Sequence, residues 1–268
     1  MKKNRVIPVL LLKNGWLVQS KGFSRHQNLG NPIDAVKRLS KWASDELIYL
    51  DISRNDVYDT KRDDQGYKNI SSFLGIIEEV SKEVFMPMTI GGKIKSLHDI
   101  EDRLLLGADK VSINTEAYYN NKLIHDAAKE FGSQCIVVSM DVKKTKLGNR
   151  VFTNFGQEDT GLDPLYWSKL MEDSGAGEIL LNSIDRDGSG EGYDIELIDE
   201  ISKMCSCPII ACGGVGEWDH FKDALDKTNV DAVAAANIFH YTDQSVYMAK
   251  KHLFNTGCNV RKPDLLKL

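Results

Sequence analysis

Short apolar runs rich in valine, isoleucine and leucine recur along the chain, separated by segments with helical spacing. Continuous runs of this kind are typical of parallel strands that are buried on both faces. They lie at residues 6–12, 47–52, 86–90, 110–115, 135–142, 178–184, 207–212 and 231–237. Eight strands alternating with helices predict a (β/α)8 barrel, which we expect to occupy residues 1–268 as one domain.

The segments between the runs carry helix boundaries and an internal repeat. One helix is expected to begin at Asn31, followed by Pro32, and another to run from Ser96 to Gly107. GADKVSINT, which follows MTIGG, resembles NVDAVAAAN, which follows IIACGG. We therefore expect two fused half-barrels. Two polar segments, 53–69 and 143–161, are long for plain connections and are predicted to be loops over the barrel mouth.

Charge and composition exclude some classes of partner. The net charge is −5 with both signs interspersed, so the sequence has no basic stripe for nucleic acid and no polybasic patch for anionic lipid. The apolar runs are far shorter than the roughly 20 residues of a membrane-spanning helix, and the N-terminus does not resemble a signal peptide. We expect a cytoplasmic protein that binds neither nucleic acid nor membranes.

The cysteines do not indicate a disulfide framework or a metal site, and no cofactor motif is recognised in the sequence. The five cysteines are odd in number and lie mostly in apolar patterns, which favours reduced thiols. Cys205 and Cys207 lack the second pair of ligands that a zinc site requires. We expect no metal and no cofactor.

Two pairs of adjacent glycines follow predicted strands, Gly91–Gly92 and Gly213–Gly214. Glycines at such a position let backbone N–H groups approach an anion, and the following helix start favours negative charge. A tight turn explains either pair taken alone. Two pairs at matching places in the two halves predict a ligand with two phosphate groups. Asn114–Thr115 and Ala236–Asn237, at the ends of the next strands, are predicted to complete the two sites.

Acidic residues at the predicted mouth are candidates for general acid–base catalysis. Asp141 is the best of them because it ends the buried run CIVVSM, although its carboxylate could equally be bonded to loop amides. Asp51 has a similar position after the second strand. Asp185 and Asp187 lie in a glycine-rich loop, where the alternatives are a turn and a ligand contact.

Charged residues also begin four of the predicted strands: Arg5, Glu46, Lys110 and Glu178. Directed toward the lower opening of the barrel, they would form a ring of two positive and two negative charges. Spacing alone favours a plainer alternative, in which charges that flank strands merely hold the barrel shut.

Several motifs together resemble the cyclase subunit of imidazole glycerol phosphate synthase over nearly the whole chain. They are RVIPVLLLKNG, ELIYLDIS, GADKVSINT, GAGEILLNSIDRDG and IIACGGVG. The resemblance implies a barrel whose glutaminase partner docks on the N-terminal face and sends ammonia through the barrel to the mouth. There the ammonia would meet a substrate with two phosphates, which is cleaved and cyclised to an imidazole and an aminoimidazole carboxamide nucleotide.

The resemblance also implies roles for individual residues. It implies an ammonia gate made of Arg5, Glu46, Lys110 and Glu178, with a contact to the glutaminase at Asp109. It implies one phosphate site at Gly91, Gly92, Asn114 and Thr115, and a second at Asp187, Gly188, Gly213 and Gly214. Asp141 matches one of the family's two catalytic aspartates. Lys93 replaces a third glycine in the first site, and Asn237 replaces a small hydroxyl residue in the second.

Leu11 occupies the position of the other catalytic aspartate, and its side chain cannot transfer a proton. A charged gate without that acid resembles the acetamidino-sugar (glycosyl amidation) branch of surface-polysaccharide gene clusters. That resemblance implies a barrel that passes ammonia to an ATP-dependent sugar amidotransferase. We favour this interpretation. The alternatives are a true cyclase that uses another acid, such as Asp51 or Asp185, and a scaffold barrel that only activates its glutaminase.

Overall fold

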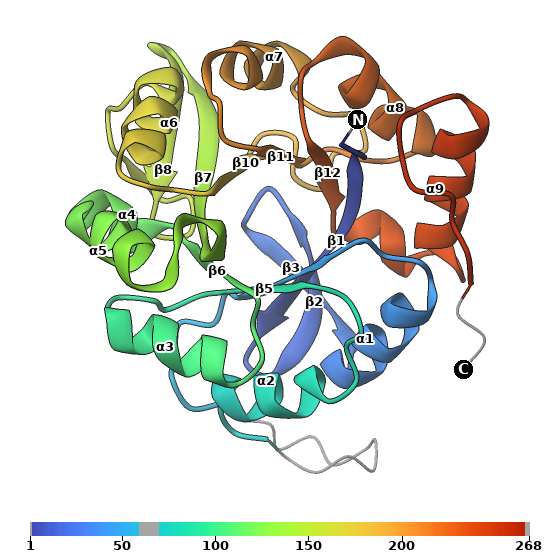
Figure 1. The fold of residues 1–268 in the computed structure, drawn as a ribbon, viewed down its shortest axis with the longest axis horizontal. Coiled ribbons are helices and arrows are strands. Elements are labelled where there is room, and N and C mark those ends of the chain that lie inside the picture. Colours follow the sequence, from blue (N-terminus) through green and yellow to red (C-terminus); the bar gives the residue numbers. More distant parts are fainter. Residues whose placement is uncertain (1, 59–69, 266–268) are drawn as a thin grey trace.

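Eight parallel strands close into a barrel in the computed structural model, which describes residues 2–58 and 70–265 (Figure 1). Around the barrel the order is β1 (Arg5–Lys13), β4 (Leu47–Asp51), β5 (Met88–Gly91), β6 (Lys110–Ile113), β7 (Ile136–Thr145), β10 (Glu178–Ser183), β11 (Ile209–Cys212) and β12 (Ala232–Ala235). Parallel pairing of β12 with β1 closes the ring. The predicted (β/α)8 fold and its eight strands are confirmed.

Helices surround the barrel (Figure 1). They are α1 (Pro32–Lys41), α2 (Phe73–Ser81), α3 (Leu97–Leu105), α4 (Thr115–Tyr119), α5 (Lys122–Phe131), α6 (Pro164–Asp173), α7 (Ile195–Met204), α8 (Trp218–Lys227) and α9 (Ser245–Asn255), with short 3₁₀ turns at Ser133–Cys135 and Asn237–His240. The predicted caps are present, because the side chains of Asn31 and Ser96 accept hydrogen bonds from the backbone N–H groups of Ile33 and Asp99. Among the described residues, none of the helices has the length and apolarity to cross a bilayer.

The two faces of each strand belong to different parts of the core. Alternate residues of β1 fill the barrel interior, as Ile7 and Val9 do, whereas Val6 and Leu10 pack against the helices. Successive strand residues point to opposite faces, so the parity of a residue determines its side. Arg5 and Leu11 therefore share the inner face of β1, at its two ends. Asp141 shares the inner face of β7 with Val137.

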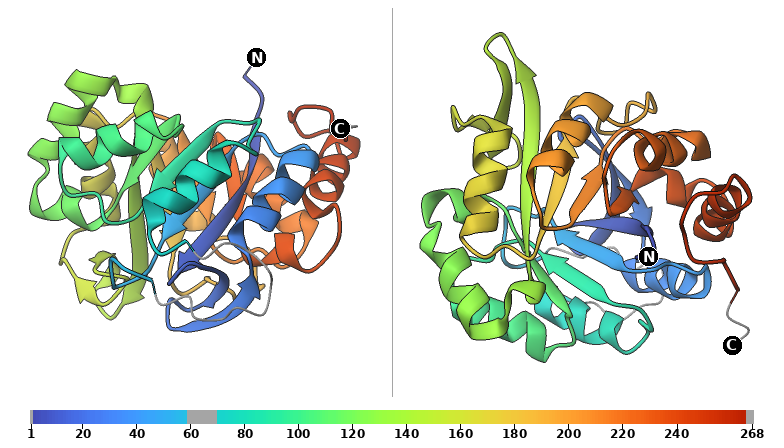
Figure 2. Two further views of the ribbon diagram at one scale, coloured as in Figure 1. Left: turned by 90° about the horizontal axis from the view of Figure 1, so that it is seen from below. Right: turned by 45° about the horizontal axis from the view of Figure 1, so that its top comes forward.

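Two antiparallel hairpins extend the sheet at the mouth. After β1 the chain forms β2 (Trp16–Lys21) and β3 (Arg25–Gly30). After the barrel part of β7 it forms β8 (Gly148–Thr153) and the short β9 (Glu158–Asp159). In the left view of Figure 2, the blue hairpin and the N-terminus lie at opposite ends of the molecule.

The second hairpin corrects one expectation. Residues 143–161 were expected to be loop, but most of them form strands, because residues 143–145 continue β7 and residues 148–153 turn back to pair with it as β8. Strand pairing satisfies their backbone groups although their side chains lack an apolar pattern. Of the other predicted mouth loop, residues 53–69, only 53–58 belong to the described part of the chain.

Candidate functional site

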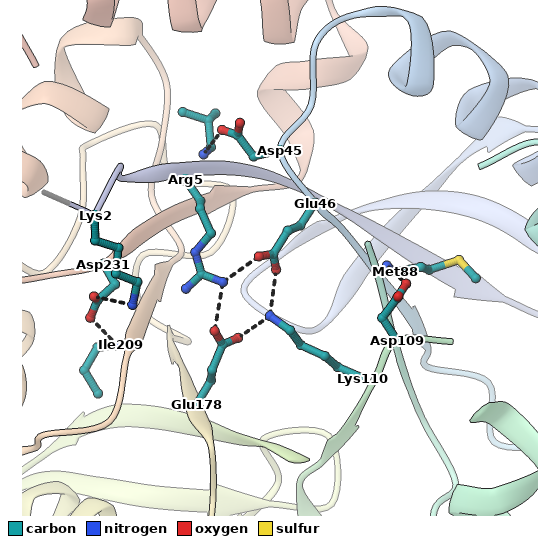
Figure 3. A network of polar contacts seen from close by, with 11 residues as sticks. Lys2, Arg5, Asp45, Glu46, Met88, Asp109, Lys110, Glu178, Ile209 and Asp231 are labelled. Atoms are coloured by element: carbon teal, nitrogen blue, oxygen red, sulfur yellow. Dashed lines mark hydrogen bonds and ion pairs between the residues drawn. The ribbon is translucent and has the colours of Figure 1, made fainter. Parts of the chain in front are cut away.

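The floor of the barrel, at the N-terminal ends of its strands, carries the four charged residues singled out in the sequence. They form a closed ring (Figure 3). Arg5 Nη1 donates to Glu46 Oε1 at 2.6 Å and to Glu178 Oε1 at 2.8 Å. Lys110 Nζ donates to Glu46 Oε2 at 3.1 Å and to Glu178 Oε2 at 2.9 Å. Each carboxylate therefore bridges both cations, and the ring has no net charge.

Burial makes the ring sensitive to the loss of any member. The four side chains are only 10% to 16% exposed. Burial by itself would lower the pKa of Arg5, but the carboxylates of Glu178 and Glu46 raise it above its usual value. Within the described residues, Nε and Nη2 of Arg5 are buried without a hydrogen-bond partner. The ring thus fills the floor with paired charges, and two guanidinium nitrogens of Arg5 remain available as hydrogen-bond donors.

Three further carboxylates lie near the ring on the same face, those of Asp45, Asp109 and Asp231, the last of which pairs with Lys2 (Figure 3). Asp109 is exposed, and its Oδ2 accepts a hydrogen bond from the backbone N–H of Met88 at 2.8 Å. It borders a surface hollow of about 330 Å³ that Phe85 and Pro87 also line. Asp45 accepts from the N–H of Val6 and pairs with buried Lys250 at 2.7 Å. Sequence analysis missed this pair because its members are 205 positions apart.

At the mouth, Asp141 is a buried carboxylate on the inner face of β7. Asn114 Nδ2 donates to its Oδ2 at 2.9 Å and Asn182 Nδ2 to its Oδ1 at 3.4 Å. Burial raises the pKa of Asp141 to about 7; the two amide donors oppose the shift, and the charge of Asp187 adds to it. Sequence analysis missed Asn182, although its parity with Leu180 assigns it to the inner face of β10.

Leu11 lies in the same interior layer at the mouth. It packs against the inner core together with Leu50, Cys212 and Ala236. Of these neighbours Cys212 alone carries an ionisable proton, and burial raises the pKa of its thiol to about 12, so it is a poor acid–base group at neutral pH. At the mouth end of the described interior, the carboxylate of Asp141 thus faces a hydrocarbon side chain at position 11, where the resemblance implies a second carboxylate.

The two alternative acids are engaged elsewhere. Asp51 points to the outer side of β4, where its Oδ1 accepts from the N–H of Ser53 at 2.8 Å and its Oδ2 from the Tyr58 hydroxyl at 2.9 Å. Asp185 is exposed and accepts from the N–H of Lys144 at 2.7 Å. Neither contact directs a carboxylate into the barrel beside Asp141.

Close packing explains the first glycine pair. A Cβ atom on Gly91 would lie 2.5 Å from Leu50, and one on Gly92, whose φ is +109°, would lie 2.4 Å from the carbonyl oxygen of Asp51. Arg103, which sequence analysis missed, donates from Nη2 to the carbonyl oxygen of Gly92 at 2.8 Å. The turn is therefore held from both sides, and only glycine fits it.

The polar neighbours of this turn already have partners within the chain. Lys93 forms ion pairs with Asp51 at 3.4 Å and Asp56 at 3.2 Å. The hydroxyl of Thr115 accepts a hydrogen bond from the N–H of Asn154 at 3.1 Å. The ammonium group of Lys93 is thus directed to the segment after β4.

The second predicted phosphate site is covered by the β2–β3 hairpin. Asp187 Oδ2 accepts from the Ser20 hydroxyl at 2.7 Å and from the N–H of Phe23 at 3.1 Å. Asn237 Nδ2 donates to the carbonyl oxygen of Ser20 at 2.6 Å, and its Oδ1 accepts from the N–H of Ser20. Backbone contacts constrain the glycines listed here: Gly188, Gly213 and Gly214. Ala236 faces the barrel interior.

Comparison with known proteins gives one consistent result. The family model described as "Histidine biosynthesis protein" matches residues 5–245. The chain is 40% identical over 263 residues to the imidazole glycerol phosphate synthase subunit HisF of Clostridium botulinum (strain Okra / Type B1). It is 41% identical over 262 residues to the protein of the same name from Bacillus cereus (strain Q1). In both cases 97% of this chain and the whole relative are covered.

Proposed function

Because the chain belongs to the histidine biosynthesis protein family and is HisF-like, we propose that it is the barrel subunit of a glutamine-dependent synthase. In this proposal a glutaminase docks on the floor, near Asp109, and releases ammonia below the charged ring. Ammonia crosses the barrel interior and reacts, or is handed on, at the mouth. The observation that carries the proposal is the closed ring of Arg5, Glu46, Lys110 and Glu178 at the axis of the floor.

The chemistry of ammonia fits this arrangement. Ammonia is a nucleophile only while it is unprotonated, so an enclosed passage away from bulk water preserves its reactivity. The interior above the ring is lined by aliphatic side chains such as Ile7, Ile48 and Leu180, which offer no proton. The paired ring has no net charge, so it does not hold back a neutral molecule. An ion that entered alone would find no unpaired counter-charge in the ring.

The first candidate reaction is the cyclisation carried out by imidazole glycerol phosphate synthase. The names of the relatives favour it over the sugar modification that sequence analysis preferred. Asp141 supports it, because a carboxyl group with a pKa near 7 can both accept and donate a proton at neutral pH. Glycine turns at the ends of β5 and β11 would receive the two phosphates of the substrate.

Leu11 favours a second candidate, in which the barrel passes ammonia to an ATP-dependent amidotransferase that converts an acetamido sugar to an acetamidino sugar. A cyclase that lacks the acid at position 11 needs a replacement. Asp51 and Asp185 are poor replacements, because their carboxylates are bonded outside the barrel interior. Under this proposal the mouth delivers ammonia and performs no proton transfer of its own.

Turnover with an ammonium salt and the bisphosphate precursor of the histidine pathway separates the two candidates. For a cyclase we expect imidazole product, with a roughly 10²–10⁴-fold loss in the Asp141→Asn variant because a positioned acid–base group is removed. Asp185→Asn is the matched variant: a comparable loss there would identify Asp185 as the recruited acid.

The absence of product at any ammonium concentration would exclude the cyclase. The second candidate then predicts glutamine-dependent amidination of an acetamido sugar nucleotide when the glutaminase and the sugar amidotransferase are added. Lys110→Ala should uncouple glutamine hydrolysis from amidination. Unchanged coupling in that variant would favour a scaffold barrel that passes no ammonia.

A further inference from the structure

The β7–β8 hairpin projects from the mouth, and its two faces differ. In the right view of Figure 2 it is the lime-green strand pair that rises beyond the helices. Val142 and Val151 are paired across the hairpin and belong to the core between barrel and helices, on the side of α6. Because side chains alternate along a strand, the other face carries Asp141, paired with Phe152, and continues the barrel interior above the mouth.

This inner face of the hairpin carries two cations directly opposite each other. Lys143 pairs with Arg150 in the strand register, two positions beyond the pairing of Asp141 with Phe152. Like charges placed directly across a pair of strands destabilise it. Lys143 Nζ lies 5.7 Å above the centre of the Phe152 ring, which holds it on this face.

Neither cation has a carboxylate within ion-pair distance in the part of the chain that the structure describes. The one hydrogen bond of the Arg150 guanidinium there joins Nη1 to the carbonyl oxygen of Asn149 at 3.3 Å. Two other cations at the mouth do have carboxylate partners: Lys93 pairs with Asp51, and Arg186 lies 3.5 Å from Glu191. The hairpin thus presents two uncompensated positive charges on the face that it shares with Asp141.

We infer that Lys143 and Arg150 form an anion site for a phosphate or diphosphate group of a small-molecule ligand at the mouth. An arginine fork binds phosphate oxygens in two parallel hydrogen bonds, and a lysine adds a point charge. Alternate strand residues are about 7 Å apart, so an anion held here lies within the length of a small ligand from Asp141. This site is separate from the glycine turns and rests on the proposed function only in having the ligand at the mouth.

Calorimetric titration of the full chain with inorganic pyrophosphate at about 0.15 M ionic strength, where charges are screened over about 8 Å, tests the inference. The double variant Lys143→Gln/Arg150→Gln should weaken binding at least about tenfold, since two charge-assisted contacts are lost. The matched control is Lys144→Gln/Lys146→Gln, which removes the same charge from the opposite face and the turn of the same hairpin. It should change the affinity less than about twofold, because it alters only the long-range field.

Three outcomes would overturn the site: no binding of pyrophosphate to the wild type, equal weakening in both double variants, or no weakening in either. Thermal unfolding checks the fold, and the first double variant should melt at the wild-type temperature or above it because a like-charge pair has been removed. The single variant Lys143→Gln gives the same test if the double variant is unstable. The titration requires no turnover, so its result is independent of whether the barrel cyclises a substrate or passes ammonia on.

Discussion

The two ends of the barrel treat charge in opposite ways although the same strands build both. At the floor, Arg5, Glu46, Lys110 and Glu178 satisfy one another in a ring without net charge. At the mouth, the partners of Asp141 among the described residues are two neutral amides, and Leu11 adds an apolar side chain to the same interior. The charges of the floor are therefore paired and neutral as a group. At the mouth, the pKa of Asp141 is raised to about 7, so its carboxyl group is partly protonated at neutral pH.

This difference teaches where a substitution is tolerated. A ring whose members each have two partners loses both when one is neutralised, and a buried charge is left behind. A lone buried carboxyl group with a raised pKa has lost part of the hydration of its ionised form. Replacing it by a neutral side chain removes this desolvation cost. The floor should therefore depend on its charges for stability, and the mouth should depend on them for chemistry.

A large loss of stability is expected from neutralising one carboxylate of the ring with Glu178→Gln. The amide cannot pair with both Arg5 and Lys110, so we expect the free energy of unfolding to fall by about 1–3 kcal/mol, below the value for a fully buried pair because the ring is partly exposed. Urea denaturation measures the change.

The matched control is Asp126→Asn, which removes the acid of the surface pair Lys122–Asp126. It should leave the free energy of unfolding within about 0.5 kcal/mol of the wild type. If both variants lose the same amount, the ring contributes no more than a surface pair, and the contrast between floor and mouth fails.

The pH dependence of stability should reveal the opposite behaviour at the mouth. Because the pKa of Asp141 is raised to about 7, the folded protein keeps a proton that the unfolded chain releases above its ordinary pKa near 4. Stability is therefore lost as pH rises between these values, by up to about 1.4 kcal/mol per pH unit from this group. Below pH 4 and above pH 7 this contribution is constant.

Comparison of the wild type with Asp141→Asn over pH 4 to 8 isolates the group. The difference in the free energy of unfolding between the two proteins should change steadily over that interval in favour of the variant. A difference that is independent of pH would mean that the carboxyl group is ionised throughout, and the mouth would then resemble the floor.

The smallest effect concerns the attachment of the β2–β3 hairpin to the mouth. Ser20→Ala removes the hydroxyl that donates to Asp187, which should lower the local stability of the hairpin by about 1 kcal/mol. Hydrogen exchange of residues 16–30 measures it. Ser24→Ala on the same hairpin removes only an exposed hydroxyl bonded to Lys21, so its exchange rates should match the wild type.

The sequence predicted most of the features that depend on the order of residues along one strand. The apolar runs located all eight barrel strands, and the caps at Asn31 and Ser96 located two helix starts. The pattern also placed charged residues at the beginnings of four strands; the family resemblance, and not their spacing, favoured a ring, and the structure brings the four side chains together. Parity along a strand is a local property, so a linear pattern determines which side chains enter the barrel.

The partners of the mouth residues were decided only by the tertiary structure. Asp51 binds Tyr58, Lys93 turns to the segment after β4, and Asn237 is held by Ser20, 217 positions away. Residues 143–145 and 148–150 formed paired strands where loop was expected, because pairing of the two strands outweighed their polar composition. Contacts of this kind depend on how connections meet once the barrel has closed, and their geometry is not written in the spacing of any single segment. Strand parity in the sequence determined that Leu11 lies on the inner wall. Only the fold determined that the carboxylates of Asp51 and Asp185 are held by hydrogen bonds outside the barrel interior.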